Sequence, residues 1–188
     1  MPTPHRVAVI VGSLRKGSFN RKMALALKAM APPSMTLEIV EIGGLPLYNQ
    51  DDDAAPPAPS AAFKQAIAGF DAVLFVTPEY NRSVPGVLKN AIDIASRPYG
   101  KSAWDGKPAG VISLSPGAIG GFGANHHLRQ SLVFLNMPTM GQPEAYVGGA
   151  GDMFDEADAI KKPETAKFMG TFLDKFEAWI ERTGKAAS

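Results

Sequence analysis

The sequence predicts an α/β fold in which a five-stranded parallel sheet lies between two layers of helices. Strand-like and helix-like segments alternate along the 188 residues, and residues 72–77 are apolar without interruption. A strand that helices cover on both faces has such a run. Repeated strand–helix units imply right-handed crossovers and a doubly wound sheet. Because no linker or internal repeat divides the chain, we expect one domain over residues 1–188.

The first half of the chain supplies two strands and two helices. Residues 6–11 form an aliphatic run typical of a strand, and residues 18–30 place their apolar side chains on one helical face. Residues 37–41 alternate, as a strand with one exposed face does. An Asp- and Pro-rich segment at 51–59 predicts a surface loop, and Ser60 is a suitable cap for a helix at 60–68.

The second half repeats the pattern. The strand at 72–77 precedes a helix at 85–96, which begins at a proline, a residue suited to a first helical turn. A strand at 109–114, a helix at 124–135 and a short strand at 145–147 follow. The closing helix, 163–182, carries aromatic residues at the spacing of a buried face.

Composition excludes several classes of function. The net charge is +1 and no long basic run is present, which argues against nucleic acid as a partner. The apolar runs are too short to span a bilayer, so we expect no membrane partner, with the cytoplasm as the default location. No cysteine is present, so thiolate metal sites and thiol catalysis are excluded, and redox chemistry would need a bound cofactor. The adjacent pair His126 and His127 would point to different faces of a helix, so no metal site is expected.

The loop after the first strand favours a phosphate. It places Ser13, Arg15, Ser18 and Asn20 between a buried strand and a helix N-terminus, where N–H groups and the helix dipole attract an anion. The order of Lys16 and Gly17 does not match a Walker loop, and a dinucleotide G-x-G-x-x-G is absent. The simpler alternative is that Ser18 or Asn20 only caps the helix.

Two further loops follow strands that should end at the same edge of the sheet. The first contains Pro78, Glu79, Tyr80 and Asn81. The second contains Ser115 and glycines at 117, 120, 121 and 123, which would let the backbone approach a flat ligand closely. Alone, each loop could be a solvated turn. Together with the first loop they predict a flat ring with a phosphate tail, as in flavin mononucleotide (FMN).

Three motifs resemble the NAD(P)H-dependent FMN reductase family, most closely its bacterial chromate and quinone reductase branch. They are residues 12–20 (GSLRKGSFN), 77–81 (TPEYN) and 83–93 (SVPGVLKNAID). The resemblance implies a flavodoxin-like fold, tightly bound FMN, NADPH or NADH as co-substrate, and a small electron acceptor such as a quinone, chromate, an azo dye or free flavin. The residues implied to bind FMN are Ser13, Arg15, Ser18, Phe19 and Asn20 at the phosphate end, Pro78, Glu79, Tyr80 and Asn81 along the isoalloxazine, and Ser115 and Gly117 in the third loop.

The resemblance also implies a homodimer or homotetramer with each flavin near a subunit boundary. The helices at 85–96 and 124–135 would form the contact surfaces, with Arg82, His126, Arg129 and Glu144 at the interface. Two of these residues depart from the branch. Arg82 stands where an aromatic residue is usual, and His126 stands where tyrosine is frequent.

We expect no catalytic protein residue, because no Ser-His-Asp set, metal cluster or cysteine nucleophile is evident. The flavin would take a hydride from the nicotinamide and pass two electrons to the acceptor. Glu79 is the acidic candidate beside the ring, unless its side chain points to solvent. One alternative is a flavodoxin-type electron carrier without its own NAD(P)H oxidation, although carriers are typically acidic and this chain is not. Another is a non-redox regulatory protein with the same fold.

Overall fold

Five parallel strands form the centre of the molecule in the order β2-β1-β3-β4-β5. The computed structural model describes residues 3–184, so residues 1–2 and 185–188 of the predicted domain lie outside the described residues. The strands are β1 (His5–Val11), β2 (Met35–Ile39), β3 (Ala72–Thr77), β4 (Ala109–Leu114) and β5 (Ala145–Val147). Each neighbouring pair is parallel, as predicted. This strand order is that of the flavodoxin-like fold.

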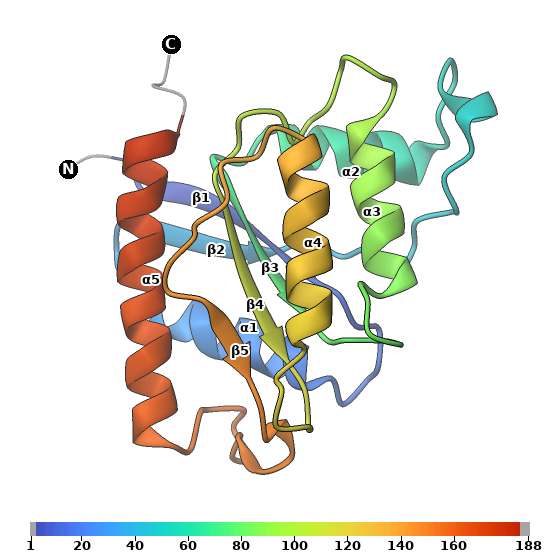
Figure 1. Cartoon of the computed structure of the whole chain (residues 1–188). Helices are drawn as coiled ribbons and strands as arrows, with labels where there is room; N and C mark the ends of the chain where they lie inside the picture. The colour runs from blue at the N-terminus through green and yellow to red at the C-terminus, as the bar shows by residue number, and fades with distance from the viewer. Residues whose placement is uncertain (1–2, 185–188) are drawn as a thin grey trace.

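Helices cover both faces of the sheet (Figure 1). They are α1 (Phe19–Met30), α2 (Ala58–Ala68), α3 (Gly86–Ser96), α4 (Phe122–Phe134) and α5 (Pro163–Thr183), with short 3-10 turns at η1 (Gln50–Asp52) and η2 (Ala150–Asp152). Helices α1 and α5 pack on one face, and α2, α3 and α4 on the other.

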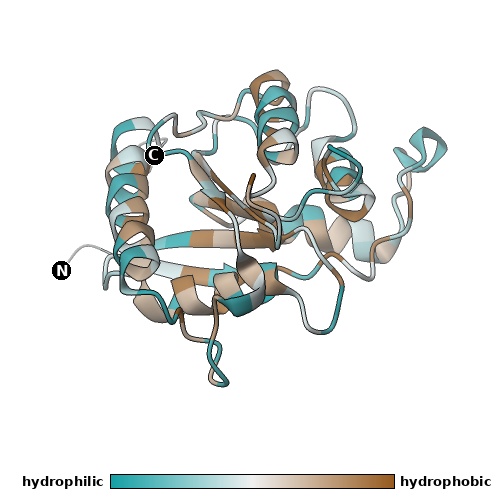
Figure 2. Cartoon of the chain, turned by 60° about the horizontal axis from the view of Figure 1, so that its bottom comes forward, coloured by the Kyte–Doolittle hydropathy of each residue, from teal (hydrophilic) through white to brown (hydrophobic). Residues whose placement is uncertain are grey.

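Alternation along the strands builds two apolar cores. On β1, Val7 and Val9 face the α1 and α5 side, whereas Ala8 and Ile10 face the other helices. The β3 and β4 residues are buried on both faces, which explains their unbroken apolar runs. Figure 2 shows the resulting pattern, with hydrophobic strands inside and helices that are hydrophilic on their outer faces.

Three predicted boundaries are wrong by two residues or more. Helix α4 begins at Phe122 rather than at 124. Strand β2 covers Met35–Ile39 rather than 37–41, because its pairing with β1 runs from Met35 to Ile39. Helix α2 begins at Ala58, ahead of the predicted start, and Pro57 occupies the cap position without a side-chain hydrogen bond. Ser60 is therefore not a cap but a buried residue of the first turn. Proline is tolerated in a first helical turn, so the helix extends into the proline-rich segment.

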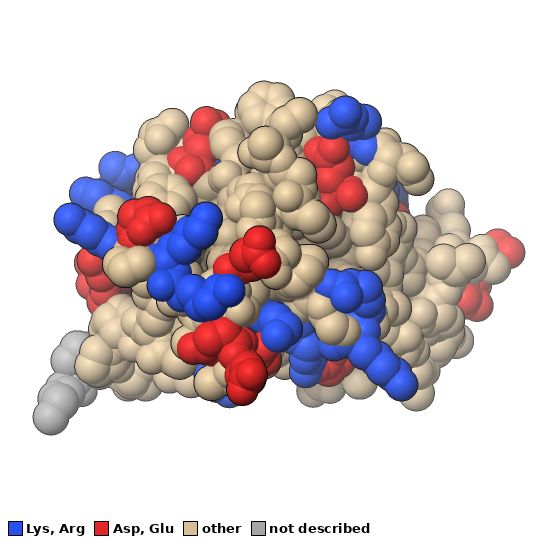
Figure 3. Space-filling model, turned by 90° about the horizontal axis from the view of Figure 1, so that it is seen from below, with Lys and Arg blue, Asp and Glu red and all other residues tan. Residues whose placement is uncertain are grey.

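The surface at the carboxyl ends of the strands carries charges of both signs. Viewed from below, basic and acidic side chains are interspersed on a largely uncharged surface (Figure 3). Within residues 3–184, no helix is long and apolar enough to cross a membrane. Across the same residues, no group of three or more His, Cys, Asp and Glu side chains is arranged to hold a metal ion.

Candidate functional site

The loops after β1, β3 and β4 meet at the carboxyl edge of the sheet, as predicted. Strands β1 and β3 are neighbours, but their helices α1 and α3 leave on opposite faces. Ligands of doubly wound sheets bind at this kind of reversal. The first loop lies directly on β3: the N–H of Gly12 donates to the carbonyl of Val76 at 2.9 Å. A Cβ on Gly12 would lie 2.7 Å from Thr77 Oγ1, so only glycine fits there.

The first loop has the form of an anion cradle at a helix start. Ser18 is the N-cap of α1, and its hydroxyl accepts a hydrogen bond from the N–H of Arg21 at 3.3 Å. The Ser13 hydroxyl accepts from the N–H of Arg15 at 3.4 Å. The guanidinium of Arg15 is exposed and lies 4.9 Å from the centre of the Phe19 ring. Because Ser18 supplies the cap, the other polar residues of the loop are not needed for capping.

Asn20 marks the base of this cradle. Its side chain is buried, and the amide nitrogen donates to the carbonyl of Leu114 at the end of β4, at 3.4 Å. The amide oxygen Oδ1 is also buried and has no hydrogen-bond partner in the described structure. An unpaired buried acceptor is costly, so a donor from a bound molecule would stabilise this position.

The second loop turns its acidic residue inward. The Glu79 side chain is 13% exposed, and its Oε2 accepts a hydrogen bond from the N–H of Ala124 at 3.1 Å. Gly121, the N-cap residue of α4, provides no side-chain cap, so Glu79 takes that role from a distant loop. The alternative in which Glu79 points to solvent is therefore wrong. The contact also fixes the second loop to α4.

The glycines of the third loop serve internal packing more than ligand access. A Cβ on Gly120 would lie 2.5 Å from the carbonyl carbon of Tyr146, and one on Gly123 would lie 2.8 Å from the carbonyl oxygen of Arg82. Gly121 has a φ of +76° and faces Ser113. Only Gly117 among the predicted set has open space, its nearest neighbour being Ser115 Oγ at 3.8 Å. These contacts within the protein explain the glycines at 120, 121 and 123, so the three residues are not by themselves a sign of a flat ligand.

Three of the predicted interface residues lie around Tyr146 of β5: His126 and Arg129 on α4, and Glu144 just before β5. The hydroxyl of Tyr146 and Nε2 of His126 are 2.9 Å apart. Burial, then a hydrogen bond with Glu144 and the charge of that residue, raise the pKa of Tyr146 to about 12. Arg129 donates from Nη1 to the carbonyl of Met140 at 2.8 Å, and burial lowers its pKa. Its Nη2 is buried without a partner in the described residues.

Arg82, the fourth predicted interface residue, lies apart from this cluster on the second loop. Its Nη1 is 3.5 Å from Glu79 Oε1, and its side chain is 78% exposed.

Sequence reasoning missed the buried polar link behind the cluster. The side chain of Asn125 is fully buried, donates to Ser113 Oγ at 3.2 Å, and accepts from Nε of Arg129 at 2.8 Å. It also missed a contact between Ser83 Oγ and His127 Nδ1 at 3.0 Å. The signal for Asn125 was an amide on the helix face that otherwise carries Ala124, Leu128 and Leu132. The Ser83–His127 contact spans 44 residues and leaves no local pattern.

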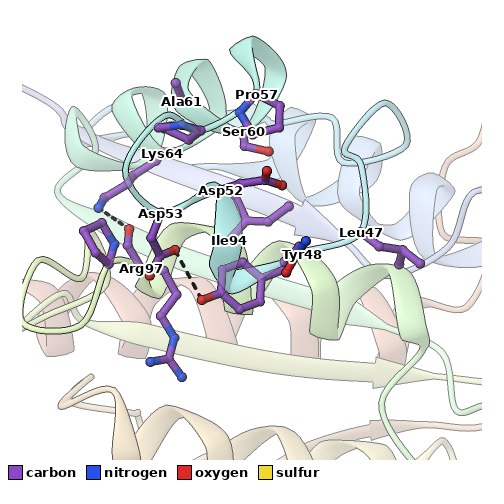
Figure 4. Close-up of a pocket in the computed structure, with 13 residues that line it drawn as sticks. Leu47, Tyr48, Asp52, Asp53, Pro57, Ser60, Ala61, Lys64, Ile94 and Arg97 are labelled. Atoms are coloured by element: carbon purple, nitrogen blue, oxygen red, sulfur yellow. Dashed lines mark hydrogen bonds between the residues drawn. The ribbon is translucent and has the colours of Figure 1, made fainter.

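A separate cavity of about 70 Å³ lies beside the C-terminal end of α3, between η1 and α2 (Figure 4). Within it, the Tyr48 hydroxyl donates to Asp53 Oδ1 at 3.2 Å, and the Lys64 ammonium donates to the carbonyl of Arg97. Burial, followed by the charge of Lys101, lowers the pKa of Lys64. These polar groups hold the η1 segment against α2 and α3, so we assign the cavity no ligand.

Comparison with known proteins gives a consistent result. The model of the NADPH-dependent FMN reductase family matches residues 5–152. A quinone reductase of Pseudomonas putida is 60% identical over 182 residues, which are 96% of this chain and 97% of that protein. A 2-hydroxy-1,4-benzoquinone reductase of a Burkholderia species is 50% identical over 93% of this chain and 96% of that protein.

A solved structure agrees with these relatives. The flavoenzyme NAD(P)H:(acceptor) oxidoreductase FerB from Paracoccus denitrificans superposes with a TM-score of 0.91 at 44% identity, covering 96% of this chain and all of the FerB chain. The family match spans the strands, helices and all three loops that build the candidate site. The chain belongs to the NADPH-dependent FMN reductase family.

Proposed function

We propose that this chain is an FMN-dependent oxidoreductase that takes a hydride from NADPH or NADH and reduces quinones by two electrons. The observation that carries the proposal is the meeting of the three loops at the β1/β3 reversal, in a chain of the FMN reductase family. In the overall reaction, NAD(P)H, a proton and a quinone give NAD(P)⁺ and a hydroquinone.

The residues of the first loop fit the phosphate end of FMN. Arg15 supplies a guanidinium, and Ser13 supplies a hydroxyl in the loop between β1 and α1. Asn20 Oδ1 is a buried acceptor that lacks a donor in the described structure, so it would accept from a ribityl hydroxyl of FMN rather than bind the phosphate oxygens. Phe19 packs beneath Arg15 and limits where its guanidinium lies. Ser18 acts indirectly, by fixing the first turn of α1.

The second and third loops would hold the isoalloxazine. Pro78, Tyr80 and Asn81 lie on the loop that Glu79 fixes to α4, while Ser115 and Gly117 form the open part of the third loop. When bound, FMN supplies the hydride acceptance and electron transfer that no side chain here can supply. The Glu79 carboxylate is engaged by α4, so we assign it a positioning role and no proton transfer.

Assembly and location are proposed on more limited observations. Val133 and Phe134 on the outer face of α4 are 74% and 75% exposed, which is unusual for large apolar side chains on a free surface. Together with the unpaired Nη2 of Arg129, they support a homodimer or homotetramer formed through α3 and α4, with Glu144 near the contact. The absence of cysteine fits the reducing cytoplasm.

The test is spectroscopic. Purified protein should be yellow, and excess NADPH or NADH under anaerobic conditions should bleach it before any acceptor is present. After the excess nicotinamide has been removed under anaerobic conditions, one equivalent of a simple benzoquinone per flavin should restore the colour. A flavin that stays oxidised under both nicotinamides would refute the proposal and favour an electron carrier.

A further inference from the structure

The turn Tyr80–Ser83 places an arginine in an unfavourable backbone conformation. The N–H of each end residue donates to the carbonyl of the other, at 3.1 Å and 3.0 Å. The two central residues, Asn81 and Arg82, have φ values of +50° and +64°. Asparagine tolerates this region, but glycine is the usual residue at the second central position. The chain thus accepts backbone strain to keep an arginine at the tip of a loop of the candidate site.

The tip is held rigidly against α4. Glu79 accepts from the N–H of Ala124, and Ser83 Oγ lies 3.0 Å from His127 Nδ1, so both ends of the turn are attached to the same helix. Between them, the carbonyl of Arg82 lies so close to Gly123 that a Cβ there would be 2.8 Å away. The base of the Arg82 side chain therefore has a fixed position relative to the site.

The guanidinium of Arg82 is open to a further anion. Its side chain is 78% exposed, and its ion pair with Glu79 has a long N–O distance of 3.5 Å. The same carboxylate is engaged through its other oxygen by α4. An exposed pair of this length contributes little to stability, so a second anion can bind without displacing a strong partner.

We infer that Arg82 binds a phosphate of the nicotinamide dinucleotide. This rests on the proposed function, in which the second loop lies along the isoalloxazine. Hydride transfer requires the nicotinamide ring to lie on the flavin ring, so the phosphates of the dinucleotide must extend outward across the rim of the site. The planar fork of arginine matches phosphate oxygens. A small neutral quinone carries no charge with which this residue could pair.

The experiment compares Arg82→Gln and Arg82→Gly with Arg182→Gln as the matched control. Arg182 lies in the last turn of α5, against Trp179. This turn is at the opposite end of the fold from the carboxyl ends of the strands, where the candidate site lies (Figure 1). Calorimetry on the FMN-loaded proteins measures the Kd of NADP⁺ and NAD⁺. Anaerobic stopped-flow measures the Kd of NADPH and the limiting rate of bleaching.

Both Arg82 variants should weaken dinucleotide binding roughly tenfold, the scale of one charge-assisted hydrogen bond, with the limiting bleaching rate changed less than about twofold. FMN content should be unchanged, and Arg82→Gly should have a Tm at or above that of Arg82→Gln, since glycine relieves the positive φ. Arg182→Gln should bind as wild type does.

Three results would overturn the inference. If the Kd values of Arg82→Gln for the dinucleotides are within twofold of the wild-type values, Arg82 does not contact the phosphate. An effect confined to the KM of the quinone would assign Arg82 to the acceptor, and a shift to smaller species in light scattering would assign it to a subunit contact. If wild type itself is not bleached, the proposed function has failed, which is a distinct outcome.

Discussion

Replacement of Glu79 by alanine tests whether the second loop supports the start of α4. Glu79 is 13% exposed and accepts from the N–H of Ala124, while the N-cap residue Gly121 offers no side chain. Loss of a cap lowers stability by about 1 kcal/mol, and a hydrogen bond to a charged group contributes about 1.5–3 kcal/mol. The carboxylate also faces the positive end of the α4 dipole.

We therefore expect Glu79→Ala to lower the free energy of unfolding by about 2 kcal/mol, or the Tm by about 4–8 °C for a chain of this length. Glu79→Gln keeps an acceptor oxygen without the charge and should lose about 1 kcal/mol or less. Urea unfolding should be measured with a fixed excess of FMN, because bound ligand adds to stability.

The control for the ion pair is Arg82→Gln, which keeps the capping contact and should change stability by only a few tenths of a kcal/mol, as expected for an exposed pair. A loss below about 0.5 kcal/mol for Glu79→Ala would show that α4 does not depend on this cap, and the positioning role of Glu79 would be wrong.

Three further predictions concern the cradle, the assembly and the alkaline range. Arg15→Ala should weaken FMN binding by about 1.5–3 kcal/mol in a fluorescence titration and leave riboflavin binding unchanged, whereas equal affinity of wild type for both flavins would contradict the phosphate assignment. Arg129→Ala should shift light scattering toward smaller species at unchanged FMN content, and a wild type that is monomeric and fully active would refute this. The pKa of Tyr146 is raised to about 12 from an ordinary 10, so its contribution to stability is complete below pH 10 and is lost as the pH rises toward 12. Tyr146→Phe should flatten the fall in unfolding free energy across this window, and an unchanged slope would show that another group titrates there.

The fold could be predicted because its signals are local. The unbroken apolar runs of β3 and β4 and the alternating strand–helix order follow from burial of a sheet on both faces. The positions of the candidate loops then follow from topology alone, since parallel strands end at one edge.

The side-chain roles within the site could not be predicted, because they depend on contacts between distant residues. Glu79 is 45 residues from Ala124, whose N–H it accepts at the start of α4, and no spacing in the sequence reveals this. Glycines at 120 and 123 are suited equally to admitting a ligand and to close backbone packing, and only the three-dimensional contacts distinguish these uses. Tyr146, in the middle of a three-residue strand, carries no pattern that indicates its contact with His126.

The close backbone contacts around β5 limit how this enzyme could be engineered. A Cβ on Gly148 would lie 2.6 Å from the carbonyl oxygen of Ala118. A Cβ on Gly120 would lie 2.5 Å from the carbonyl carbon of Tyr146. A side chain in place of either glycine would therefore push the end of the edge strand and the third loop apart. Ile119, in the same loop, is 60% exposed. Changes of acceptor range are better sought through side-chain libraries at 117–119 than through substitutions at 120 or 148.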